Sequence, residues 1–85
     1  MSFAAKLVKS GSTPIYLVTC KDPSGRNCFY FVISNPRKMS LLAKIKDGFF
    51  NINDYGKIIA SGFGDKPSEE VLQRLKLEYN FDFEG

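Results

Sequence analysis

The densest run of apolar and aromatic positions in the chain lies between residues 15 and 34. It consists of two segments rich in Ile, Val, Tyr and Phe, separated by Asp22-Pro23-Ser24-Gly25, a pattern typical of a β-hairpin. Proline suits the first central position of a type I turn, and Gly25 can supply the left-handed residue of the bulge that follows. The sequence therefore predicts that Asp22 pairs with Arg26 and that the numbers of paired residues add up to 48.

This register divides the hairpin residues between two faces. One face carries only apolar residues and one threonine, which is typical of a core face: Ile15, Leu17, Thr19, Phe29, Phe31 and Ile33. The other face is equally free of charge: Tyr16, Val18, Cys20, Cys28, Tyr30 and Val32. An antiparallel strand with one solvated face normally places charges there. We therefore expect the second face to be covered too, either by another part of the chain or by a partner.

The second alternative makes this face a candidate interface. Tyrosine combines a large apolar ring with a polar tip and is enriched at protein interfaces. The candidate interface residues are Tyr16, Val18, Tyr30 and Val32.

The segments around the hairpin show weaker signals. Residues 3–9 are compatible with a first strand or a short helix, and residues 49–53 with a short strand or an ordered loop. Asn35 and Pro36 are typical of a helix start, and the apolar stripe that follows predicts an amphipathic helix near residues 36–47. Residues 57–61 resemble a strand, followed by a loop over residues 62–66.

A second amphipathic helix is expected to begin at Ser68 and to end at Asn80, which can adopt a left-handed conformation. The predicted order is β-β-β-α-β-α, an α+β fold with a small, mainly antiparallel sheet around the central hairpin 15–34. Eighty-five residues, 44% of them hydrophobic, are enough for one domain over residues 1–85.

Two features bear on the compartment. No apolar run approaches the roughly 18 residues that a membrane-spanning helix needs. The first residues include Lys6 and Lys9 and do not form the apolar stretch of a signal peptide. We therefore expect a cytoplasmic protein without a membrane partner, in which cysteines stay reduced. The register nevertheless places Cys20 opposite Cys28, within disulfide range, although no Cys-x-x-Cys spacing is present.

Charge is distributed unevenly along the chain. Residues 1–46 contain eight basic and one acidic side chain, giving +7, whereas residues 47–85 contain four basic and eight acidic ones, giving −4. Such asymmetry favours an acidic partner or a nucleic acid, unless the fold neutralises it. A candidate anion or nucleic-acid patch consists of Lys21, Arg26, Arg37 and Lys38. Sheet tyrosines could stack on bases beside it.

Catalytic signatures are missing from the sequence. There is no histidine, which removes the commonest general base and the usual zinc sites. The segment Gly62-Phe63-Gly64 departs from the dinucleotide fingerprint, because Pro67 stands where the third glycine is needed. We therefore assign no catalytic residue, no metal ligand and no cofactor, and we expect no enzyme.

Two hypotheses follow from these observations. The first is a small binding or assembly module that acts through protein–protein contacts at the Tyr/Val face, as a homo-oligomer or with a protein partner. The alternative is a single-stranded nucleic-acid-binding module that uses sheet tyrosines and the basic first half of the chain.

Overall fold

The computed structural model of the protein describes residues 4–44 and 51–81. Its elements follow the predicted α+β order, with one short 3-10 turn added before the last strand. The strands are β1 (Ala4–Lys9), β2 (Ile15–Lys21), β3 (Asn27–Ile33) and β4 (Lys57–Phe63). The helices are α1 (Pro36–Ala43), η1 (Ile52–Asp54) and α2 (Glu69–Tyr79). Residues 3–9 thus belong to a strand rather than a helix over their described part.

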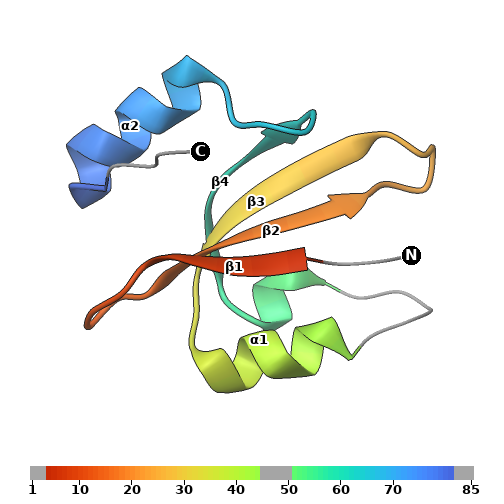
Figure 1. Ribbon diagram of the computed structural model, residues 1–85, viewed down its shortest axis with the longest axis horizontal. Coiled ribbons are helices and arrows are strands. Elements are labelled where there is room, and N and C mark those ends of the chain that lie inside the picture. Colours follow the sequence, from red (N-terminus) through yellow and green to blue (C-terminus); the bar gives the residue numbers. More distant parts are fainter. Residues whose placement is uncertain (1–3, 45–50, 82–85) are drawn as a thin grey trace.

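The four strands form one antiparallel sheet in the order β1-β2-β3-β4 (Figure 1). The hairpin register is confirmed, because Ile15 lies opposite Ile33 and Lys21 opposite Asn27, with every pair in between as predicted. The backbone N–H of Asp22 donates to the carbonyl of Arg26 at 2.9 Å, which closes the ladder at the loop.

Side-chain caps begin the two helices where the sequence predicts them. The Asn35 side chain accepts a hydrogen bond from the Lys38 N–H at 2.8 Å, and the Ser68 hydroxyl accepts one from the Val71 N–H at 3.4 Å. Asn80 ends α2 with φ 50° and ψ 48°, the predicted left-handed conformation. Helix α1 ends earlier than predicted, at Ala43, and residues 45–47 of the predicted helix lie outside the described residues.

Two other segments differ from the sequence interpretation. Gly62 and Phe63, expected in a loop, extend strand β4, because they pair with Phe29 and Cys28 of β3. Of the ambiguous segment 49–53, residues 49 and 50 lie outside the described part, and residues 51–53 lead into η1 instead of forming a strand.

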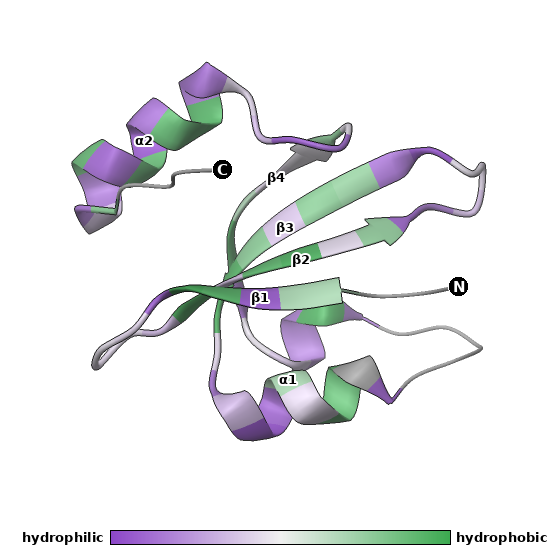
Figure 2. Cartoon of the chain, in the orientation of Figure 1, coloured by the Kyte–Doolittle hydropathy of each residue, from purple (hydrophilic) through white to green (hydrophobic). Residues whose placement is uncertain are grey.

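The two helices lie on opposite faces of the sheet (Figure 1), and each covers one apolar layer. One layer joins β2 and β3 to α1 and η1, and its buried residues come from all four elements: Tyr16, Val18, Val32, Met39, Leu42 and Ile52. The opposite layer joins the other hairpin face to α2 and to Phe81, two residues beyond the end of this helix: Ile15, Phe29, Phe31, Leu75 and Phe81. Apolar residues accordingly concentrate in the middle of β2 and β3 (Figure 2).

This arrangement corrects the candidate interface. Tyr16 is 7% exposed and Val18 and Val32 are 0% exposed, while Tyr30 is partly buried against the same layer. The Tyr/Val face is therefore covered by the chain's own helix α1 and by Ile52, and these four side chains do not form a free docking surface. The physical reason is that the Met39/Leu42 stripe needs an apolar surface to bury, and this face offers it.

A close contact between strands β3 and β4 provides a test of the packing in the opposite layer, the one that contains Phe29 and α2. A Cβ atom at Gly62 would lie 2.7 Å from Cζ of Phe29, whose ring is buried over the glycine. We predict that Gly62→Ala lowers the free energy of unfolding by about 1–3 kcal/mol, because the ring must move within a packed layer. The loss should be smaller in a Phe29→Leu background, as measured by urea denaturation in a double-mutant cycle. Equal losses in both backgrounds would contradict the contact.

Candidate functional site

The loop of the β2–β3 hairpin is held by one carboxylate. The side chain of Asp22 accepts hydrogen bonds from the Ser24 N–H at 3.0 Å, from the Ser24 hydroxyl at 2.6 Å and from the Arg26 N–H at 2.9 Å. Gly25 follows with φ 88°, the left-handed conformation that the predicted bulge requires. The hydrogen bonds from Ser24 and Arg26 lower the pKa of the Asp22 carboxyl below its ordinary value, because they stabilise its charged form.

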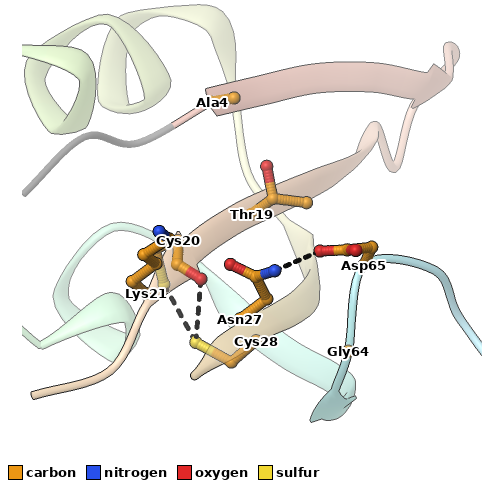
Figure 3. A pocket seen from close by; sticks show the side chains of 8 residues that line it. All are labelled: Ala4, Thr19, Cys20, Lys21, Asn27, Cys28, Gly64 and Asp65. Carbon is orange, nitrogen blue, oxygen red and sulfur yellow. Dashed lines mark hydrogen bonds between the residues drawn. The ribbon is translucent and has the colours of Figure 1, made fainter. Parts of the chain in front are cut away.

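A pocket of about 490 Å³ opens beside this loop, where the ends of all four strands meet (Figure 3). Its wall is polar on the β4 side, where the Asn27 amide donates to the Asp65 carboxylate and the Gly64 N–H donates to the Asn27 carbonyl at 2.8 Å. The residues that line it are Ala4, Thr19, Cys20, Lys21, Asn27, Cys28, Gly64 and Asp65. One ammonium, one carboxylate, one amide and one hydroxyl could therefore contact a small polar group there.

Two sulfur atoms lie at the side of this pocket. The Sγ atoms of Cys20 and Cys28 are 3.2 Å apart, and the Cys28 thiol also lies 3.4 Å from the Cys20 carbonyl oxygen. Burial, followed by the hydrogen bond with Cys28, raises the pKa of the Cys20 thiol to about 12. The Cys20 thiol is therefore protonated at neutral pH, and it is a weak nucleophile in that form.

Tyr30, which lies near the two cysteines, is also partly buried. Burial raises the pKa of Tyr30 as well, so its hydroxyl is not available as a base at neutral pH. Within residues 4–44 and 51–81, no group of three or more Cys, Asp or Glu side chains is placed to hold a metal ion.

The candidate anion patch is divided between two ends of the molecule. Lys21 and Arg26 lie beside the hairpin loop, whereas Arg37 and Lys38 belong to the first turn of α1, beyond the other end of the sheet (Figure 1). A strand of seven residues spans roughly 20 Å, so the two pairs cannot contact one short ligand together. The structure does not bring the four residues into one patch.

One member of this patch has an aromatic partner that the sequence interpretation missed. The guanidinium carbon of Arg26 lies 4.1 Å from the centroid of the Phe63 ring, and Phe63 is 64% exposed. The sequence predicts a loop at Phe63, and the signal that could have placed it in the strand is a β-favouring aromatic residue two positions after Ser61. Exposed aromatic rings and guanidinium planes are both groups on which a base can stack.

The outer edge of β1 is a second surface that sequence reasoning missed. β1 is the end strand of the sheet, and four of its six residues are exposed. The Asp22 N–H bonds toward β3, so in β2 the backbone groups of even-numbered residues face β3 and those of odd-numbered residues face β1. Ala4 and Lys6, which pair with Thr19 and Leu17, therefore bond to β2.

The alternate residues of β1, Ala5 and Leu7, consequently direct their N–H and C=O groups away from the sheet. Leu7 is also 48% exposed, and its side chain lies on the face covered by α1, because it pairs with Tyr16. Leu41, on α1, is 50% exposed, and α1 contacts β1. Neither α1 nor α2 is long and apolar enough to cross a bilayer.

The pKa of Asp22 leads to a prediction about pH. A carboxyl whose pKa is lower in the folded state stabilises the fold above its unfolded pKa of about 3.9, and this contribution is lost as the pH falls through the folded pKa. We expect Asp22→Asn to be less stable than the wild type at pH 7 and the difference to shrink toward pH 2, as measured by urea denaturation. A difference that stays constant over this range would show that the charge is not involved.

Comparison with known proteins gives no match: no protein-family model, no curated protein and no solved structure is significantly similar to the chain. Any function of the protein must therefore be inferred from its own residues and their geometry.

Proposed function

We propose that the protein is a small non-catalytic assembly module that acts through protein–protein contacts, and that its partner is a second copy of the same chain. The observation that carries this proposal is the exposed outer edge of β1, with the outward backbone groups of Leu7 and its half-exposed side chain. An exposed strand edge is a template for pairing with another strand. The partner surface is thus the strand edge and not the buried Tyr/Val face.

The residues of β1 favour one register for this pairing. Antiparallel pairing centred on Leu7 places this residue opposite Leu7 of the second copy, so that two apolar side chains meet. Pairing centred on Lys6 would instead place two ammonium groups opposite one another, which is destabilising. The dimer would then contain one continuous antiparallel sheet.

The charge on this edge makes the proposed dimer sensitive to salt. Lys6 is exposed and lies next to the centre of the pairing, so the two copies bring positive charges near each other. Salt screens such repulsion over about 8–10 Å. Self-association should therefore strengthen as the salt concentration rises.

The test removes the outward N–H of Leu7 while retaining an apolar side chain. Leu7→Pro eliminates two intermolecular hydrogen bonds per dimer, and an edge strand tolerates proline where its N–H faces solvent. At about 0.5–1.5 kcal/mol per bond, we expect dimerisation to weaken about tenfold to a hundredfold, as measured by sedimentation velocity over a concentration series.

Leu7→Val is the matched control, because it keeps the N–H and an apolar side chain and should dimerise nearly as well as the wild type. Circular dichroism would establish that both variants fold. A wild-type chain that stays monomeric at high concentration, or a proline variant that dimerises like the valine variant, would contradict the proposal.

A second candidate function, single-stranded nucleic-acid binding, is favoured by the Arg26–Phe63 pair. Both side chains are about 64% exposed, and Lys21 lies at the same end of the hairpin. A base could stack on the Phe63 ring while the two cations contact phosphates. This site uses only half of the patch that the sequence suggested.

We predict that Phe63→Ala weakens the binding of a labelled oligothymidine about tenfold in fluorescence anisotropy, since stacking contributes about 1–3 kcal/mol per base. Arg37→Glu, at the far end of the sheet, is the control and should change the affinity little. Binding should weaken with added salt, the opposite of the trend for the dimer. Equal losses in both variants, or no salt dependence, would exclude a site at Phe63.

A further inference from the structure

The two cysteines of the hairpin are placed for a reaction with each other. Cys20 and Cys28 are directly opposite in the ladder, and their free thiols lie on the same face with the sulfur atoms 3.2 Å apart. Both are even-numbered, so they form a hydrogen-bonded pair, for which the Cα separation is about 5.5 Å. This separation lies inside the range of about 4.4–6.8 Å that disulfides require. Side-chain rotation can therefore bring the sulfur atoms to bonding distance.

We propose that Cys20 and Cys28 form a redox-active dithiol, which low-molecular-weight disulfides such as oxidised glutathione convert into a cross-strand disulfide. This modification site is independent of the proposed assembly function, because neither cysteine lies in β1. Cys20 belongs to β2, the next strand in the sheet, and Cys28 belongs to β3, the strand after that. No Cys-x-x-Cys motif is present, so the inference depends on the strand pairing, which the sequence predicts and the structure confirms.

The reaction proceeds in two exchanges. Both cysteines line the pocket, and Cys20 is the more exposed of the two, because Cys28 is only 5% exposed. The Cys20 thiol loses its proton to solvent and attacks one sulfur of oxidised glutathione, giving a mixed disulfide and one glutathione thiolate, which takes up a proton. The Cys28 thiol then loses its proton, attacks the Cys20 sulfur and displaces the second glutathione.

The overall exchange balances in atoms and electrons. Two protein thiols and one oxidised glutathione give one protein disulfide and two reduced glutathiones, so two electrons pass from the protein sulfurs to the oxidant. Because burial raises the pKa of Cys20 to about 12, the attacking thiolate is scarce at neutral pH. The first exchange should therefore be slow at pH 7 and accelerate as the pH rises.

The new bond would join β2 and β3 close to the hairpin loop, one residue pair before the last pair of the ladder. These strands carry Thr19, Lys21 and Asn27 of the pocket wall and end at the Asp22 turn. Oxidation would therefore restrain the part of the sheet that shapes the pocket. A cross-link of this kind limits the separation of the strands without requiring a change of register.

The experiment equilibrates the folded full-length protein with oxidised and reduced glutathione and measures intact mass and thiol content. We expect most wild-type chains to lose two hydrogen atoms in mass, to lose both reactive thiols and to remain free of attached glutathione. Peptide mapping should identify the Cys20–Cys28 bond, and an excess of reduced glutathione should restore both thiols.

The matched control is the double variant Asn27→Cys/Cys28→Ser. It retains two cysteines at nearly the same separation in sequence, but residue 27 lies on the opposite face of the sheet from Cys20. The folded control should accumulate glutathione adducts without an internal disulfide, whereas both proteins should form the disulfide to a similar extent in concentrated guanidinium chloride.

Four results would overturn the proposal. Three concern the wild type under these conditions: it keeps two free thiols, it stops at stable glutathione adducts, or it forms only intermolecular disulfides. Formation of the internal disulfide to the same extent in the folded control would also overturn it, because the geometry of the hairpin would then have no influence.

Discussion

The antiparallel ladder between β2 and β3 is the interaction on which the rest of the structure depends. Its register is set at the loop, where Asp22 accepts hydrogen bonds from Ser24 and Arg26 and Gly25 adopts a positive φ. A slip by one residue would move every side chain of one strand to the opposite face. Since the hairpin residues on both faces are apolar, the ladder can exist in water only if both faces are covered.

The chain meets this requirement with two short helices, one on each face. Helix α1 supplies Met39 and Leu42 to one layer, and α2 supplies Leu75 to the other, where Phe81 completes the cover. Each layer is thin and depends on a few large side chains, as expected for a small domain. The pocket lies at the hairpin end of the sheet, and the outer edge of β1 stays exposed.

The polar groups of the hairpin end are engaged mainly with one another. Asn27 is bonded to Asp65, and Asp22 is bonded to the backbone of its own loop. Burial keeps the Cys20 thiol protonated at neutral pH, so the pocket holds two closely spaced thiols without an activated nucleophile.

The sequence by itself determined the features that depend on residues close together in the chain. The hairpin register follows from Pro23 and Gly25, and the ends of the helices follow from Asn35, Ser68 and Asn80, because turns and caps are local hydrogen-bonding arrangements. The order of the elements and the facing of Cys20 and Cys28 were predictable for the same reason.

Only the tertiary structure decided which face each helix covers and which strand lies at the edge. Periodicity shows that α1 has an apolar stripe, but it does not show that the stripe packs over Tyr16 and Val18. The separation of Lys21 from Arg37 and the extension of β4 to Phe63 likewise depend on strand pairing across long stretches of chain. Which helix covers which face depends on the burial of apolar area in the whole molecule, a quantity that no local segment of sequence specifies.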